Sequence, residues 1–207
     1  MSIVVVGTVA FDTVETPFGR GDNVLGGSAT YFSTSASFFT DVALVAVVGE
    51  DFPEEHVTFL QERNIDTAGL QRIPGKTFHW SGRYGYDLNE AQTLDTQLNV
   101  LMDFQPELPE SYRDAEYLFL ANIDPDLQMK VLEQVRKPKL VACDTMNFWI
   151  SSKPEALKRC CRRLILSSST KVKRGSLPEK PTWSRQPGRL SPSAVSVWWS
   201  NGASTAY

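Results

Sequence analysis

The chain has 207 residues, of which 42% are hydrophobic and 22% are charged, and its formal net charge is −3. This size and composition suit one globular domain or part of a larger one, and the charge gives no indication of nucleic-acid binding. The chain has three cysteines with no Cys-x-x-Cys pair, and its two histidines lie far apart in the sequence. We therefore expect neither a disulfide framework nor a metal cluster. No apolar run approaches the roughly 20 residues of a membrane span, and the N-terminus has no basic lead. We therefore expect a cytoplasmic protein with no membrane or nucleic-acid partner.

The composition changes near residue 160. Residues 160–207 hold eight Lys or Arg residues and one acid, Glu179, which makes +7 and leaves −10 on residues 1–159. The same segment is rich in Ser and Pro and has no periodic apolar positions. Such a segment cannot bury a core, and we expect residues 164–207 to form a disordered tail.

Short apolar runs and amphipathic segments alternate along the body of the chain. The runs predict buried strands at residues 3–6, 42–48, 116–120 and 139–143. The helices expected between and after them cover residues 29–39 and begin near Pro53, at Asp124-Pro125 and at a capping box on Ser152. Strand and helix recur in turn, so that an α/β fold with a mainly parallel sheet is predicted.

Two segments break this alternation, at residues 12–24 and 76–104. Both are β-rich with polar interruptions and are expected to form hairpins. Such strands do not suit the centre of a parallel sheet. We expect them to form a small β lid over the carboxyl ends of the main strands, where open α/β sheets bind ligands.

The most informative local feature is the turn at Gly26-Gly27, which follows a strand that carries Asp12. Two adjacent glycines let a backbone approach a ligand closely, and Ser28 then opens a helix whose free N–H groups point outward. A carboxylate before that turn can bind sugar hydroxyls. The alternatives are a tight turn with no further role, and an Asp12 carboxylate that only caps backbone N–H groups.

These residues resemble the PfkB family of sugar and nucleoside kinases, whose fold is that of ribokinase. The matching pieces are Gly7, Asp12, the Gly26-Gly27 turn, residues 41–51 (DVALVAVVGED) and Asp144-Thr145-Met146-Asn147. The resemblance covers about residues 1–163, roughly the first half of a member. It implies the N-terminal half of a three-layer αβα sandwich with a mainly parallel sheet and a small β lid, whose lid strands sometimes pair in a homodimer.

The resemblance also implies an activity and a site. In this family, ATP with Mg²⁺ donates its γ-phosphoryl group to a hydroxyl of a sugar or nucleoside. Asp12 would hydrogen-bond the sugar hydroxyls, Gly26 and Gly27 would line the sugar, and Asn122 and Asn147 would belong to the same pocket. Many sugar-specific members carry Asn where this chain has Thr30-Tyr31, so the resemblance does not identify the acceptor.

The catalytic residues of the family lie later in its members. They include an Asn-x-x-Glu motif linked to Mg²⁺ and a Gly-x-Gly-Asp loop whose Asp is the general base. This chain has no Asn-x-x-Glu, and no Gly-x-Gly-Asp in its second half. No catalytic residue and no metal ligand is therefore predicted, and two interpretations stand: a kinase lineage, or a truncated, non-catalytic chain that at most binds the sugar acceptor.

The tail itself suggests an explanation for the missing motifs. If its codons are read one base out of register, residues 169–175 permit NEGEAR, the residues after them permit LAGEANLV, and residues 198–207 permit VVKRGEYGV. All three strings resemble the second half of the same family, in the right order. The hypothesis is a single-base loss near the Arg159 codon, after which the tail is translated out of frame.

Overall fold

The computed structural model of the protein describes residues 2–163, 166–169 and 196–198. A seven-stranded sheet has the order β11-β10-β9-β8-β1-β4-β5, and its paired neighbours run parallel. Its strands are β1 (Ser2–Val6), β4 (Asp41–Val48), β5 (Ile65–Arg72), β8 (Tyr117–Leu120), β9 (Leu140–Thr145), β10 (Leu166–Ser169) and β11 (Ser196–Trp198). The predicted mainly parallel sheet is confirmed.

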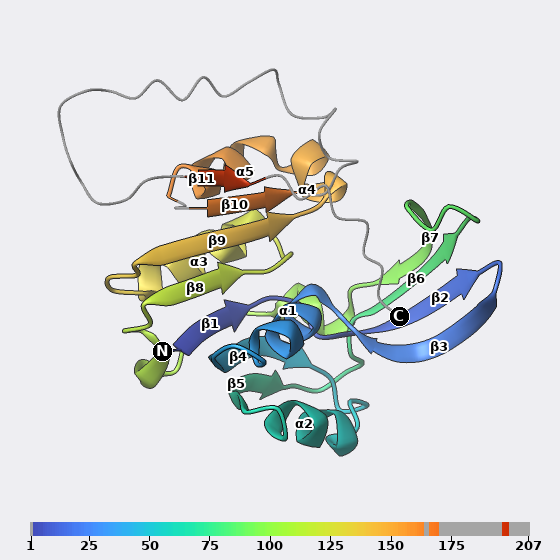
Figure 1. Cartoon of the computed structure of the whole chain (residues 1–207), viewed down its shortest axis with the longest axis horizontal. Coiled ribbons are helices and arrows are strands. Elements are labelled where there is room, and N and C mark those ends of the chain that lie inside the picture. The colour runs from blue at the N-terminus through green and yellow to red at the C-terminus, as the bar shows by residue number, and fades with distance from the viewer. Residues whose placement is uncertain (1, 164–165, 170–195, 199–207) are drawn as a thin grey trace.

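Helices cover both faces of this sheet, which explains the continuous apolar runs of its central strands. The helices are α1 (Ser28–Ala36), α2 (Glu54–Gln61), α3 (Pro125–Gln134), α4 (Asn147–Ser152) and α5 (Pro154–Cys161), with short 3₁₀ turns η1 (Asn99–Asp103) and η2 (Glu110–Tyr112). Val5 packs in one core with Ala29 of α1 and Leu60 of α2. Val4 packs in the opposite core with Val131 of α3 and Cys160 of α5, so the body has three layers (Figure 1).

A second sheet has the order β3-β2-β6-β7 and extends from the carboxyl ends of the main strands (Figure 1). Its strands are β2 (Ala10–Thr16), β3 (Gly19–Gly26), β6 (His79–Tyr84) and β7 (Ala91–Gln97). Each hairpin is antiparallel, and β2 pairs with β6 in parallel between them. The lid expected from residues 12–24 and 76–104 is therefore present, with two strands from each segment.

Two local expectations were wrong, and one strand was not predicted. Residues 99–103, expected to be β-rich, form η1, because the chain leaves the extended conformation at Leu98, with φ −65° and ψ −34°, and Asn99 then has a left-handed φ of 46°. The strand β5 was not predicted, since this edge strand has neither an apolar run nor a regular alternation. Ser152 does not cap α5: it is the last residue of α4, and its hydroxyl donates to the Phe148 carbonyl.

The tail expected at residues 164–207 differs from the structure in two short stretches. The strand β10 pairs with β9 in the register Leu166↔Ala142, and β11 pairs with β10. An open strand edge presents backbone N–H and C=O groups that can pair with almost any sequence, which is how these two short segments can add to the sheet. The remaining residues of that segment lie outside the described part of the chain, and so do the out-of-frame strings.

Candidate functional site

The Gly26-Gly27 turn leaves room for glycine only. A Cβ atom on Gly26 would lie 2.1 Å from the Asp12 carboxylate, Oδ2. Gly27 has φ +96°, and its Cβ atom would lie 2.3 Å from the Thr8 carbonyl oxygen. The turn therefore brings its bare backbone against the carboxylate that β2 delivers, as the sequence suggested for these two glycines.

The Asp12 carboxyl is largely removed from water. Burial raises its pKa to about 6, although the nearby His79 and the Gly27 N–H group lower it in part. Burial, followed by the charge of Asp12, raises the pKa of Tyr31 on α1 and of Tyr84 on β6. Two phenol groups from separate elements thus lie within the field of one buried carboxylate.

The helix α1 begins with a hydrogen-bond network that reaches a third element. The Ser28 N–H donates to the Thr8 hydroxyl at 3.0 Å, and the Ala29 N–H donates to the Thr8 carbonyl at 3.0 Å. On the other side, the Asn122 N–H donates to the Ser28 Oγ atom at 3.0 Å. This network joins the ends of β1 and β8 to the glycine turn. The short backbone segment at that turn is therefore surrounded by Asp12, Gly26, Gly27 and Asn122.

Two buried polar atoms without partners lie at the ends of β8 and β9, Asn122 Oδ1 and Thr145 Oγ1. Within the described residues the other such atoms are Thr30 Oγ1, Ser33 Oγ and Tyr112 Oη, which lie in α1 and η2. The Asn122 amide nitrogen lies 3.1 Å from the Met146 sulfur. Since buried polar atoms are nearly always paired in folded proteins, the two atoms at the strand ends indicate a place that a polar ligand or water completes. Asn147 begins α4 directly after Met146, which places its backbone at the end of β9.

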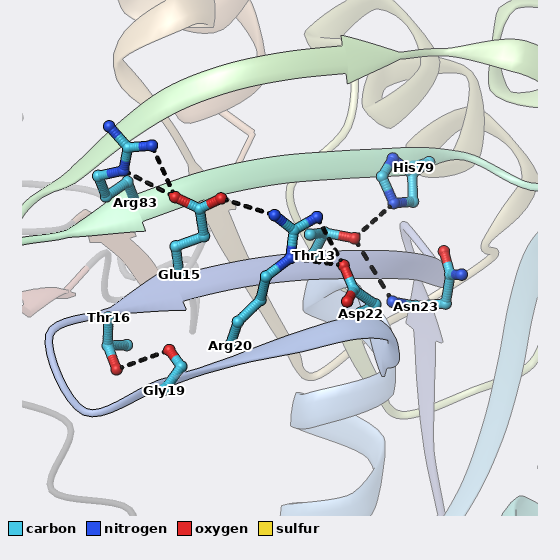
Figure 2. Close-up of polar contacts among 9 residues, drawn as sticks. All are labelled: Thr13, Glu15, Thr16, Gly19, Arg20, Asp22, Asn23, His79 and Arg83. Carbon is cyan, nitrogen blue, oxygen red and sulfur yellow. Dashed lines mark hydrogen bonds and ion pairs between the residues drawn. The ribbon is translucent and has the colours of Figure 1, made fainter.

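The opposite face of the lid is polar (Figure 2). The Glu15 carboxylate joins Arg20 at 2.8 Å and Arg83 at 2.7 Å, across three strands. The Thr13 hydroxyl lies 3.0 Å from the Nε2 atom of His79. Thr13 and Glu15 alternate with Asp12 along β2, so that this network lies on the other side of the sheet from the buried carboxylate. We interpret this network as a set of contacts that hold these three lid strands together. Exposed ion pairs of this kind contribute at most about 1 kcal/mol each to stability.

The described residues do not contain the catalytic loop of the family. The letters Gly-x-Gly-Asp do occur at Gly19–Asp22, but they lie in β3, where Arg20 pairs with Asp22. That string does not open a helix, so it lacks the anion-binding N–H groups of the loop. No group of three or more His, Cys, Asp or Glu side chains in the described ranges could hold a metal ion. None of the helices described is long and apolar enough to cross a bilayer.

The sequence did not predict four residues that shape this site. They are Thr8, Ser28 with its hydrogen bonds to two other elements, Tyr31 and Tyr84. Tyr31 follows the glycine turn by one helical turn, which could have placed it beside Asp12. Tyr84 comes from a strand that pairs with β2 only in the tertiary structure, and no sequence signal reports that pairing.

No protein-family model matches the chain. The chain is 32% identical over 160 residues to a cytidine kinase of Thermococcus kodakarensis, an alignment that covers 77% of this chain and 55% of that relative. The chain thus spans about half the length of the curated relative it matches.

Solved structures share the fold. The nucleoside kinase of Burkholderia thailandensis in complex with inosine has a TM-score of 0.71 at 10% identity, over 97% of this chain and 70% of that one. The nucleoside kinase of Methanocaldococcus jannaschii, an archaeal member of the ribokinase family, has a TM-score of 0.66 at 17% identity, over 84% and 62%. At these identities the structural likeness shows the fold alone. Together with the similarity to a kinase sequence, it shows that this chain carries a part of the ribokinase fold.

Proposed function

We propose that this chain binds the ribose part of a nucleoside or sugar acceptor, within a lineage of kinases that phosphorylate such acceptors from ATP. The observation that carries the proposal is the partly buried Asp12 carboxylate held against the bare Gly26-Gly27 backbone. A carboxylate accepts two hydroxyl hydrogens at once, and charged hydrogen bonds of this kind are the strong ones. The glycines allow the sugar ring to lie against the backbone.

The neighbouring groups suit such an acceptor. Tyr31 and Tyr84 can flank a flat or apolar part of the ligand while their hydroxyls remain polar. The unpartnered Asn122 Oδ1 and Thr145 Oγ1 atoms can pair with further hydroxyl or amino groups of the ligand. The role of Asn147 rests on its place at the end of β9 and on the family resemblance.

The phosphate side of the reaction is not supported by the residues described. Bound ATP would supply the phosphoryl group and Mg²⁺ would neutralise its charge. The Burkholderia thailandensis kinase has been solved as an ADP-inosine complex. In the described part of this chain, however, no side chains are grouped to hold a metal ion, and we derive no step through ATP or Mg²⁺. The second interpretation, an acceptor-binding chain without catalysis, rests on the sequence motifs that the chain lacks.

Isothermal titration tests acceptor binding, with cytidine, inosine and D-ribose as probes. We expect at least one probe to bind, and the matching 2′,3′-dideoxynucleoside to lose that binding because it has no diol for Asp12. An Asp12→Ala variant should weaken binding by roughly 10- to 100-fold, the scale of lost charged hydrogen bonds. Asp22→Ala is the matched control, because this carboxylate is exposed and pairs with Arg20. Equal binding of the diol and dideoxy probes would overturn the proposal.

A coupled assay for ADP release, with ATP and Mg²⁺, separates the two interpretations. We expect no turnover by this chain beyond the rate without acceptor. Turnover that depends on cytidine, inosine or ribose would show that the chain is a complete kinase and would contradict the non-catalytic interpretation. We also propose a cytoplasmic location, where ATP is available to such a lineage.

We further propose that the lid supports a homodimer. Phe18 and Tyr86 at its tips are exposed and pack edge to face, with ring centroids 6.1 Å apart, and Val24 and Leu94 are also exposed. Apolar side chains gathered on one small sheet are typical of interaction surfaces. Sedimentation equilibrium should give a dimer that Phe18→Ser weakens. A monomer at all concentrations would remove this proposal.

The out-of-frame tail remains a prediction. Cys160, just past the proposed break, is fully buried in the core and its thiol lies 3.7 Å from the Gln128 carbonyl oxygen, so the domain extends at least to this residue. Resequencing the gene from the Ser152 codon onward decides the matter. One extra base near the Arg159 codon would restore the second half of the family. An unchanged reading would leave the chain as written.

A further inference from the structure

The side chain of Gln128 lies between the ends of two neighbouring strands. It projects from α3 and is 0% exposed. Its Nε2 atom donates to the carbonyls of Ala121 at 3.0 Å and Asp144 at 3.1 Å, and lies 3.4 Å from the carbonyl of Leu120. One buried amide therefore holds the end of β8 and the end of β9 at the same time.

Two thiols fix the orientation of this amide. Cys143 and Cys160 place their sulfur atoms 3.4 Å and 3.7 Å from the Oε1 atom of Gln128. A hydrogen bond with the Cys160 thiol, together with burial, raises the pKa of the Cys143 thiol well above its usual range. The Cys143 thiol thus remains a protonated donor, and the Oε1 atom of Gln128 is a group that can accept from it. Both Nε2 hydrogens are consequently left for the strand carbonyls.

The position of this contact gives it a role beyond packing. The strands β8 and β9 stay paired as far as Leu120↔Cys143. Beyond that pair β8 ends and continues into a loop, whereas β9 continues for two more residues, Asp144 and Thr145, which pair with β10. Ala121 anchors one loop through its N–H bond to the Val6 carbonyl at 2.8 Å, and Asn122 follows with its bond to Ser28. Gln128 spans the two strands at the point where they separate.

These contacts connect Gln128 to the proposed acceptor site. The Ala121 carbonyl that it binds belongs to the residue before Asn122, and the Asp144 carbonyl lies two residues before Met146. Asn122 and Met146 approach each other at 3.1 Å on the ligand side of these strand ends. A change in the spacing of β8 and β9 would move both residues relative to the Ser28 end of the glycine turn.

We propose that Gln128 is a positioning residue that sets the distance between the ends of β8 and β9, and with it the place of Asn122 in the acceptor site. The positioning is a property of the fold, whereas its effect on ligand binding rests on the proposed function. Gln128 does not touch the ligand in this proposal. It acts through the carbonyls of Ala121 and Asp144.

The variant Gln128→Met tests the positioning, because methionine has a similar shape and cannot donate to the carbonyls. Val131→Ala is the matched control: Val131 lies on the same helix, is also fully buried in this core, and has no side-chain group that could donate to the carbonyls. We expect hydrogen exchange of the amides at residues 121–123 and 145–147 to accelerate by roughly tenfold or more in Gln128→Met, beyond any global change. In Val131→Ala we expect these amides to follow the global change only.

A measurement on the unaltered chain guards against a variant that fails to fold. In nuclear magnetic resonance spectra, the two Nε2 protons of Gln128 should exchange with solvent as slowly as core backbone amides. Exchange at the rate of exposed Gln side chains would overturn the proposal, and so would equal exchange of the strand ends in Gln128→Met and Val131→Ala.

Titration with cytidine and D-ribose then tests the effect of Gln128 on the acceptor site separately from its positioning of the strands. If the unaltered chain binds a probe, Gln128→Met should weaken that binding by about tenfold and Val131→Ala should leave it unchanged. Binding that Gln128→Met leaves unchanged would overturn the link to the acceptor site. If the unaltered chain binds neither probe, the proposed function is at fault, and the exchange data still decide whether Gln128 positions the strands.

Discussion

Because the pKa of Asp12 is raised in the folded chain, we predict that its charged carboxylate destabilises the protein at neutral pH. The difference between about 6 in the folded chain and the ordinary value of 3.8 corresponds to about 3 kcal/mol in favour of the protonated form. The carboxyl retains some contact with water, and we expect about 1–2 kcal/mol after this screening. Asp12→Asn removes the charge, keeps the shape and should recover this free energy.

The sign of the pH dependence follows from proton binding. Between pH 4 and pH 6 the folded chain holds the Asp12 proton more tightly than the unfolded chain does. The stability of the unaltered protein therefore falls as the pH rises through this window. The gain from Asp12→Asn should be small at pH 4.5 and about 1–2 kcal/mol larger at pH 8.

Urea unfolding of both proteins at pH 4.5 and pH 8 measures this difference, because other titrating groups contribute equally to the two. Asp22→Asn is the control, since Asp22 is exposed, and we expect a change within about 0.5 kcal/mol at both pH values. The reasoning would be refuted if Asp12→Asn were less stable than the unaltered protein at pH 8, or if its effect did not depend on pH. The same variant should bind the acceptor more weakly, so that stability and function oppose each other at this residue.

Two further substitutions test the supports of the site. Gly27→Ala should lower the free energy of unfolding by at least about 2 kcal/mol, because φ is left-handed at this residue and the new methyl group would meet the rigid Thr8 carbonyl. Urea unfolding measures this loss. Gly85→Ala is the control and should change stability little, because its new methyl group would have ordinary contact distances. Thr77→Val should cost about 1–3 kcal/mol, because the buried hydroxyl donates to the Asp51 carboxylate at 2.7 Å where the second lid hairpin begins. An unchanged unfolding midpoint in Thr77→Val would show that this contact does not anchor the lid.

The main strands and most helices could be predicted from the sequence because their signals are local. The run of residues 42–48 is apolar at every position, which suits only an element buried on both faces, and the structure has β4 there. Asp124 before Pro125 predicts a helix start, and in the structure the Asp124 side chain accepts from the Asp126 N–H. The edge strand β5 has neither kind of signal and was missed.

The backbone at Gly26-Gly27 has the tight conformation that a Gly-Gly pair favours, whereas the ligand role of the two glycines stays a prediction. The sequence could not show what surrounds this turn. Tyr84 reaches the site because β6 pairs with β2 in the register Phe11↔His79, a separation of 68 residues (79 − 11). Asn122 reaches it through a bond to Ser28 over a separation of 94 residues. Such contacts depend on the path of the whole chain.

The α/β alternation and the two lid segments can be read from the residues alone, because propensity and periodicity act within a few residues. The partial burial that raises the pKa of Asp12 to about 6, and the bridge that Gln128 makes between β8 and β9, emerge only in the folded chain. The first depends on how much water the folded chain excludes from the carboxyl. The second depends on which distant backbone groups come within hydrogen-bond distance of the amide. Both are set only when the layers of the fold pack together.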